Sequence, residues 1–182
     1  LNEHLEAVNH QNAIEYIKEL AKQNETITER NLLKIHYLIL QGINNKQAGK
    51  YRNLQVLISG AKHVPTQPYL VPKEIEILLL WYNENKDKLH PIVLSAEIHE
   101  RLVTIHPFID GNGRTARLLM NLILLQNGFP IAILKGDIDS RLKYYSALET
   151  AQVERNKEPF INLIIQNLEE MLQRMIRILE NL

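Results

Sequence analysis

The chain has 182 residues, which is enough for one domain with a sizeable core. Its 21 basic and 21 acidic residues balance, so no net charge favours binding to nucleic acid or to a membrane. It has no cysteine, which excludes disulfides and thiolate metal sites and is compatible with a cytoplasmic location. No apolar stretch is long enough to span a bilayer, and no signal peptide opens the chain. Because the first residue is Leu1 and not Met, we expect a single domain over residues 1–182 that lacks upstream residues of the full-length protein.

The first half of the chain has mainly helical periodicity. Apolar residues at helical spacing predict a first helix over residues 5–20, and Thr28 is a suitable N-cap for a second helix that ends at Gly42. The polar residues 43–53 predict a loop. Residues 54–66 contain a short run rich in Val, Leu and Ile, which predicts a small β-hairpin, the only strand-like element expected.

The second half predicts further helices. Pro72 and Pro91 stand where proline starts a helix, and later helices are expected over residues 114–127, 138–154 and 159–181. The helix over 114–127 is apolar on every side, which predicts the buried centre of an all-α bundle. The last helix carries an apolar stripe. Core packing is the favoured interpretation of this stripe, and the alternative is that its far end contacts a partner or a domain outside this chain.

Residues 106–117 carry the chemistry, with the sequence His-Pro-Phe-Ile-Asp-Gly-Asn-Gly-Arg-Thr-Ala-Arg. A glycine-rich turn that enters a helix favours a phosphate, because free N–H groups and the helix dipole point at the anion. Arg114 and Arg117 add forked cationic donors, and Asp110 supplies the single carboxylate that Mg²⁺ needs beside phosphates. His106 can accept a proton near pH 7. The segment therefore predicts metal-assisted chemistry on a nucleotide phosphate.

Each of these residues also has an ordinary explanation. A lone His106 is more often a buried structural histidine, Asp110 and the glycines suit any turn, and the arginines suit a solvated helix face. Taken together, these explanations leave the clustering unexplained. A metal site of His99, Glu100 and His106 is discounted, because this spacing matches no zinc motif.

The segment resembles the signature of the Fic family, His-Pro-Phe-x-Asp-Gly-Asn-Gly-Arg-x-x-Arg, at all nine specified positions. The resemblance extends over most of the chain, from about residue 2 to residue 165. It includes Gly49-Lys50-Tyr51-Arg52, Ile98-His99, Arg141-x-x-Tyr144-Tyr145 and Pro159-Phe160.

This resemblance implies an all-α Fic-type helical bundle with a small β-hairpin flap. It also implies a protein adenylyltransferase, which transfers AMP from ATP to a Ser, Thr or Tyr hydroxyl of a target protein and releases pyrophosphate. The implied cofactor is Mg²⁺, with ATP as co-substrate. The implied partner is a protein substrate docked by the flap, with neither nucleic acid nor membrane, and a homodimer is left open.

The resemblance also implies roles for individual residues. His106 would be the general base, Asp110 would hold Mg²⁺ on the phosphates, and Phe108 would pack inward to fix the loop. Phosphate contacts are implied for Gly111, Asn112, Gly113, Arg114 and Arg117, adenine contacts for Tyr144 and Tyr145, and target docking for the flap residues Val56, Leu57 and Ile58.

Some positions depart from the family pattern or leave alternatives open. Gly113 stands where a kinase-like branch has lysine, which favours nucleotidyl transfer, whereas Gln152 differs from the smaller amide that many members have near the adenine. The inhibitory Ser/Thr-x-x-x-Glu-Gly/Asn motif has no complete copy here, and we expect it upstream of Leu1. Two alternatives are a hydrolase that removes AMP from proteins and a non-enzymatic domain that binds a nucleotide.

Overall fold

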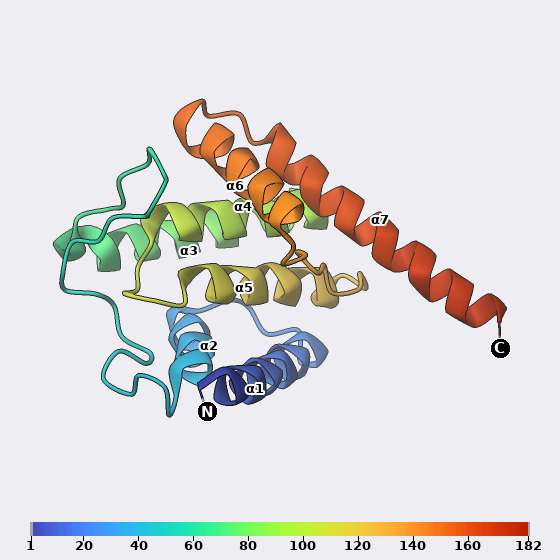
Figure 1. Cartoon of the computed structure of the whole chain (residues 1–182), viewed down its shortest axis with the longest axis horizontal. Coiled ribbons are helices and arrows are strands. Elements are labelled where there is room, and N and C mark those ends of the chain that lie inside the picture. Colours follow the sequence, from blue (N-terminus) through green and yellow to red (C-terminus); the bar gives the residue numbers. More distant parts are fainter. Residues whose placement is uncertain (1, 182) are drawn as a thin grey trace.

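Seven α-helices and one short 3₁₀ helix make up the fold that a computed structural model describes for residues 2–181 (Figure 1). No β-strand is present among these residues. The elements are α1 (Asn2–Lys22), α2 (Glu29–Leu40), η1 (Pro68–Leu70), α3 (Val71–Asn85), α4 (Pro91–Ile105), α5 (Asn112–Gln126), α6 (Ile138–Val153) and α7 (Glu158–Glu180).

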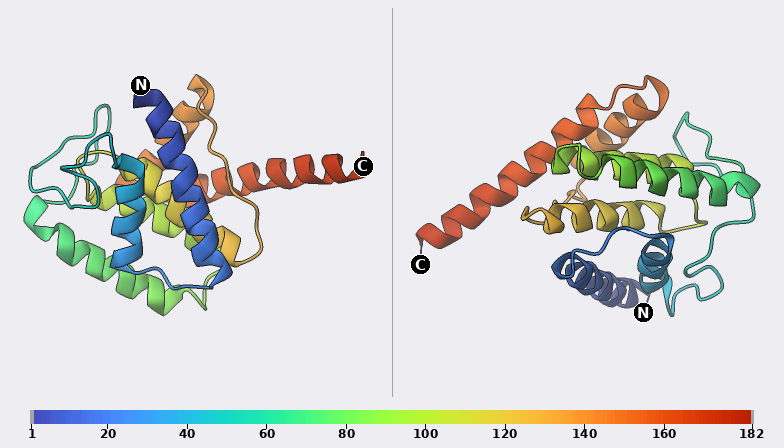
Figure 2. Two further views of the ribbon diagram at one scale, coloured as in Figure 1. Left: turned by 90° about the horizontal axis from the view of Figure 1, so that it is seen from below. Right: turned by 180° about the vertical axis from the view of Figure 1, so that it is seen from behind.

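Helix α5 lies at the centre of the bundle, as its apolar sequence predicts. It packs against α1 and α2 on one side and against α4 on the other, and α6 and α7 pack on α4 (Figures 1 and 2). It begins at Asn112, two residues before the expected Arg114, because Gly111 adopts the left-handed conformation (φ 81°) that ends the preceding loop. Its buried residues after the first turn are Thr115, Ala116, Leu118, Leu119, Met120, Asn121, Leu122, Ile123 and Leu124.

Helix α2 starts where the sequence predicts. The Thr28 hydroxyl accepts a hydrogen bond from the Asn31 N–H at 3.2 Å, and the Asn31 side chain accepts one from the Thr28 N–H at 3.2 Å. This reciprocal pair is a capping box with asparagine in the third position. It fixes the register of the helix that carries His36, a residue that contacts the candidate site.

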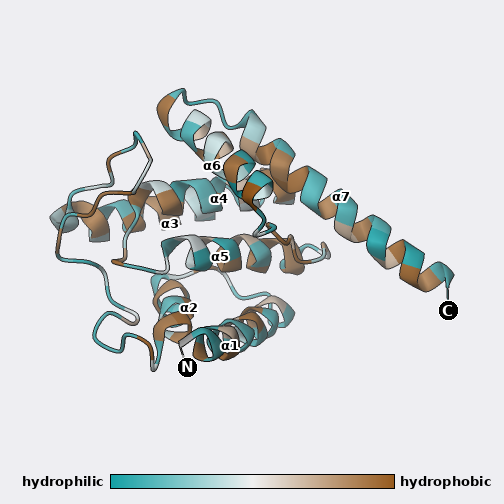
Figure 3. Cartoon of the chain, in the orientation of Figure 1, coloured by the Kyte–Doolittle hydropathy of each residue, from teal (hydrophilic) through white to brown (hydrophobic). Residues whose placement is uncertain are grey.

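Helix α7 is only half covered. Phe160, Ile164 and Leu168 are buried against the bundle, and the rest of the helix projects away from it (Figures 1 and 2). The projecting part still alternates apolar and polar residues (Figure 3). Its exposed apolar side chains include Leu172, Met175, Ile176, Ile178 and Leu179. Core packing therefore explains the first half of the apolar stripe but not the second half.

The β-hairpin expected over residues 54–66 is not formed. This flap segment runs outward, turns at Gly60 and returns, but within it only the turn bond from the Ala61 N–H to the Ile58 carbonyl joins backbone to backbone. Leu54 and Leu57 are 64% and 81% exposed, and Val56 and Ile58 are only half-buried, so none of these four apolar side chains enters the core. An isolated two-stranded ladder is marginal in water, which accounts for the difference.

Among the described residues, every helix is too short or too polar to cross a bilayer.

Candidate active site

The candidate site begins at the signature loop, residues 106–111, which joins α4 to α5. His106 follows the last residue of α4 in the left-handed conformation (φ 53°, ψ 60°), which is uncommon for a residue other than glycine. Its N–H still donates to the Leu102 carbonyl at 2.9 Å. The chain thus turns sharply at the histidine and brings the next residues back over the start of α5.

The interior of the loop is held by Phe108 and Asn112, both of which are buried. The Asn112 side chain accepts from the Phe108 N–H at 2.9 Å and donates to the Phe108 carbonyl at 2.8 Å. The Phe108 ring packs inward, as expected. The Asn112 side chain is therefore occupied within the loop, and only the backbone of this residue is left for the phosphate contact that the sequence led us to expect.

His36 of α2 holds the loop in place through contacts with Phe108 and Asp110, a role that the sequence did not reveal. This fully buried imidazole stacks on Phe108 with ring centres 3.6 Å apart and an interplanar angle of 5°. Its Nδ1 accepts from the Gly49 N–H at 3.0 Å, so its Nε2 carries the proton and donates to the Asp110 carbonyl at 3.0 Å. Burial lowers the pKa of His36 to about 4, so the neutral form persists at pH 7.

The first turn of α5 offers backbone donors. The Gly111 N–H donates to the Asp110 carboxylate at 2.6 Å, and the first helical bond runs from the Thr115 N–H to the Gly111 carbonyl. The N–H groups of Asn112, Gly113 and Arg114 precede that bond, as at any helix start. They are the donors through which the glycine pattern predicts that this turn, here called the anion-binding turn, holds a phosphate.

Arg114 and Arg117 lie on successive turns of α5 and differ in their partners. Arg114 Nη2 pairs with Asp110 Oδ2 at 2.9 Å, and the Asp110 side chain is 64% exposed. Arg117 Nε donates to the Gly113 carbonyl at 3.0 Å, and no carboxylate lies within ion-pair distance of it among residues 2–181. Arg117 therefore carries a positive charge that a ligand anion can neutralise.

Tyr144 and Tyr145 lie on α6. Tyr144 is half-buried, and its hydroxyl lies 3.3 Å from His99 Nε2, whereas Tyr145 is exposed and contacts the edge of Tyr144 at 5.3 Å between ring centres. Burial lowers the pKa of His99 to about 3, and the Arg117 charge contributes to this lowering. Burial raises the pKa of Tyr144, and the Arg117 charge opposes this shift.

The protonation state of His106 suits a base. Its Nδ1 lies 3.3 Å from the Val103 carbonyl oxygen, so Nδ1 carries the proton and Nε2 presents a lone pair. Burial lowers the pKa of His106, the Val103 carbonyl opposes this shift, and the charges of Arg52 and His63 add to it. The imidazole is therefore neutral at pH 7.

Two side chains, one just before the flap segment and one within it, contact the backbone at the end of α4 and the start of the loop. The buried Arg52 donates through Nε to the His106 carbonyl at 2.7 Å, and His63 Nε2 donates to the Thr104 carbonyl at 2.8 Å. The three flap residues expected to dock a target are Val56 and Ile58, which are half-buried, and Leu57, which is exposed.

The donor set fits Mg²⁺ that arrives with a nucleotide. No group of three or more His, Cys, Asp or Glu side chains among residues 2–181 forms a protein cage for a metal. Asp110 offers one exposed carboxylate beside the anion-binding turn. Mg²⁺ commonly takes one or two carboxylates and completes its octahedron with phosphates and water.

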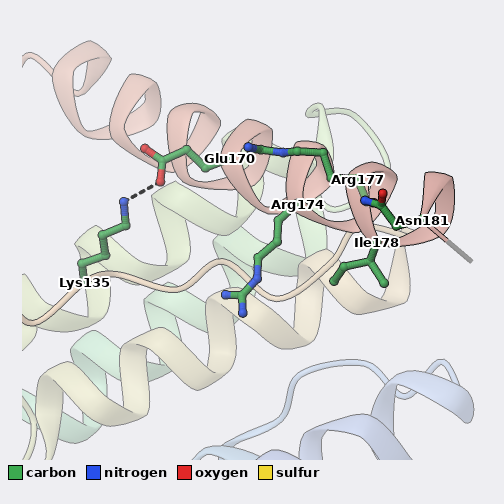
Figure 4. A pocket seen from close by; sticks show the side chains of 6 residues that line it. All are labelled: Lys135, Glu170, Arg174, Arg177, Ile178 and Asn181. Atoms are coloured by element: carbon green, nitrogen blue, oxygen red, sulfur yellow. Dashed lines mark hydrogen bonds and ion pairs between the residues drawn. The ribbon is translucent and has the colours of Figure 1, made fainter.

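A separate hollow lies between α7 and the segment before α6, and none of the motif residues line it (Figure 4). An ion pair between Lys135 and Glu170, 2.6 Å long, closes one end of it. Charged and polar side chains of the projecting half of α7 make up most of its wall. It is therefore not the site where the signature loop would act.

Comparison with known proteins relates this chain to a known family. A sequence model of the Fic/DOC family matches residues 26–124, and this range contains the signature loop. Protein adenylyltransferase Fic of Nematostella vectensis is 38% identical over 164 residues, which cover 89% of this chain and 37% of the relative. Protein adenylyltransferase fic-1 of Caenorhabditis elegans is 32% identical over 179 residues, which cover 97% of this chain and 34% of the relative.

The fold agrees with this assignment. The solved structure of C. elegans Fic-1 (residues 134–508 in its own numbering) superposes with a TM-score of 0.88 and 32% identity, and the match covers all of this chain and 53% of that one. The chain spans about a third of the length of the curated relatives. The family model covers more than half of the chain, and the chain therefore belongs to the Fic/DOC family.

Proposed function

We propose that this chain is the catalytic domain of a protein adenylyltransferase, which transfers AMP from ATP to a Ser, Thr or Tyr hydroxyl of a target protein. One observation carries the proposal: a neutral His106 ends α4, and the short loop that follows it leads into a helix start that offers N–H groups and two arginines to an anion. A base beside a phosphate site is the minimum that hydroxyl attack on phosphorus requires.

The reaction proceeds as an in-line displacement. The target hydroxyl oxygen forms a bond to the α-phosphorus of ATP, and its proton passes to His106 Nε2. The bond between the α-phosphorus and the oxygen that bridges to the β-phosphate breaks, and pyrophosphate leaves. The Val103 carbonyl holds the proton on Nδ1, so that Nε2 is the accepting atom.

Phosphate binding is divided between backbone and side chains. The free N–H groups of Asn112, Gly113 and Arg114 bind phosphate oxygens, and the Gly111 N–H, which donates to Asp110 in the free chain, joins them when the nucleotide binds. Arg114 and Arg117 hold the β- and γ-phosphates, because a guanidinium fork matches two phosphate oxygens. Asp110 would hold Mg²⁺, which would supply neutralisation of the phosphate charge. Asp110 and Arg114 exchange their mutual ion pair for these partners when the nucleotide binds.

Tyr144 and Tyr145 bind the adenine, and the flap residues Val56, Leu57 and Ile58 pair with an extended segment of the target. Two more distant proteins support parts of this proposal at the level of the fold. BepC of Bartonella tribocorum, 17% identical with a TM-score of 0.60, carries bound AMPPNP. IbpAFic2, 19% identical with a TM-score of 0.68, has been solved tethered to the protein Cdc42.

The test is incubation of the chain with Mg²⁺, α-labelled ATP and candidate proteins. Label on protein, lost in His106→Ala and kept in the exposed control His4→Ala, supports the proposal. Reversible ATP binding without label would indicate a nucleotide-binding domain instead. Release of AMP from a premodified target, with no forward transfer, would indicate the hydrolase.

A further inference from the structure

The Arg52 side chain joins the flap segment to the signature loop. It is 2% exposed, and its guanidinium donates to three backbone carbonyls from separate stretches of chain. Nε donates to His106 O at 2.7 Å, Nη1 donates to Leu54 O at 3.0 Å, and Nη2 donates to Thr66 O. The Arg52 N–H also donates to the Pro107 carbonyl at 2.9 Å. Leu54 and Thr66 are the two ends of the flap segment.

Burial of the Arg52 guanidinium costs desolvation free energy, so the contacts that offset this cost indicate what the residue does. No carboxylate lies within ion-pair distance of the guanidinium among the described residues, and burial lowers the pKa of Arg52. A buried charge without an opposite charge is unfavourable unless its donors are well satisfied. Only the planar fork of arginine reaches three acceptors in different directions, whereas the ammonium of lysine is a single point.

The hydrogen bond from Arg52 to the His106 carbonyl holds a residue whose backbone is strained. A non-glycine residue in the left-handed region costs about 1–3 kcal/mol and needs surrounding contacts to hold it there. His106 is held through its N–H by Leu102 and through its carbonyl by Arg52. The same guanidinium closes the two ends of the flap, which has no backbone ladder of its own.

We propose that Arg52 is a positioning residue that sets the flap and His106 as one unit, so that a target docked on the flap presents its hydroxyl to the histidine. The presentation of a target hydroxyl rests on the proposed function. The coupling of the flap to His106 rests only on the three carbonyl contacts of Arg52. A second contact, from His63 to the Thr104 carbonyl, ties the returning arm of the flap to the last turn of α4. Arg52 and His63 are the charged or titratable groups whose fields act on His106.

Two substitutions separate the geometry of Arg52 from its charge. Arg52→Lys keeps the charge and loses the fork, whereas Arg52→Gln loses both, and the exposed Arg174→Gln on α7 is the control. Both Arg52 variants should speed hydrogen exchange over residues 54–66 and raise the KM for the target about 10- to 100-fold, the effect of one lost hydrogen bond to a charged group. The KM for ATP should stay within about threefold of the parent value, since no phosphate contact changes.

The pH profile distinguishes positioning from a general loss of structure. Removal of the Arg52 charge removes one cause of the lowered pKa of His106, so Arg52→Gln should move the acid limb of kcat to higher pH, whereas Arg52→Lys should not. The same pKa can be followed by NMR of the His106 ring without turnover. Unchanged flap exchange and an unchanged target KM in both variants would overturn the proposal.

If the variants do not fold, the parent protein still tests the contact. The Arg52 Nε–H should give a slowly exchanging NMR signal, and a rapidly exchanging signal would refute the inference. If the parent protein transfers no AMP, the proposed function fails, but flap exchange and the His106 titration still test Arg52.

Discussion

Replacement of His36 by phenylalanine tests how much the signature loop depends on an imidazole that touches no substrate. The variant keeps an aromatic ring against Phe108 but removes the donor to the Asp110 carbonyl and the acceptor of the Gly49 N–H. Each orphaned buried group costs about 1–3 kcal/mol. Because both hydrogen bonds are only partly buried, the lower half of that range applies to each group, and the total loss is about 2–4 kcal/mol.

The expected consequence is measurable by thermal unfolding. For a chain of this size, a loss of about 2–4 kcal/mol lowers Tm by roughly 4–16 °C. The affinity for Mg²⁺-ATP should fall as well, because the Asp110 carbonyl loses its anchor next to the anion-binding turn. His4→Phe, at an exposed position on α1, is the matched control and should leave Tm within about 1 °C. A His36→Phe variant with the Tm and ATP affinity of the parent would refute the view that these two hydrogen bonds fix the loop.

Three further predictions concern pH, the phosphates and the flap. The fold lowers the pKa of His36 from 6.5 to about 4, so its neutral form contributes about 3 kcal/mol to the free energy of unfolding. This contribution is complete above pH 6.5 and is lost as the pH falls toward 4, and denaturant titrations at both pH values would measure the loss. Arg114→Lys should weaken Mg²⁺-ATP binding about tenfold in calorimetry because the forked contact is lost, and unchanged affinity would contradict that geometry. Ile58→Pro removes an N–H that donates no hydrogen bond within the free chain, so Tm and ATP binding should persist while target modification falls at least tenfold. Equal loss of stability, ATP binding and target modification would show that Ile58 has a structural role.

The parts of the site that lie within one stretch of sequence were predictable. The glycine turn and the entry into α5 depend on residues within one segment of twelve, and the turn follows from its glycines, whereas the left-handed conformation of His106 does not follow from its residue type. The buried α5 was predictable too, because a helix without a polar face has to lie in a core.

The contacts between distant segments were not predictable. His36 meets Asp110 across 74 positions, and Arg52 meets His106 across 54, so neither partner could be found from spacing alone. On the sequence, His36 is one more residue of an amphipathic helix. The flap had the composition of a hairpin, but a strand ladder depends on what covers it, and Leu57 is covered by nothing in the described chain.

The half-exposed α7 shows the same dependence on context. Its apolar stripe runs without a break from Phe160 toward Leu179, and periodicity gives no sign of where the bundle stops covering it. Only the packing of α4 and α6 against its first turns decides that Leu168 is buried and Leu172 is not.

The most direct test of the proposed reaction is single-turnover transfer of labelled AMP by the parent chain and by His106→Ala, with ATP affinity measured on both. We expect transfer to fall about 10²- to 10⁴-fold, the usual contribution of a positioned base, while the Kd for Mg²⁺-ATP changes less than about threefold. Transfer by His106→Ala at the rate of the parent, with the fold intact, would contradict the assignment of His106 as the base.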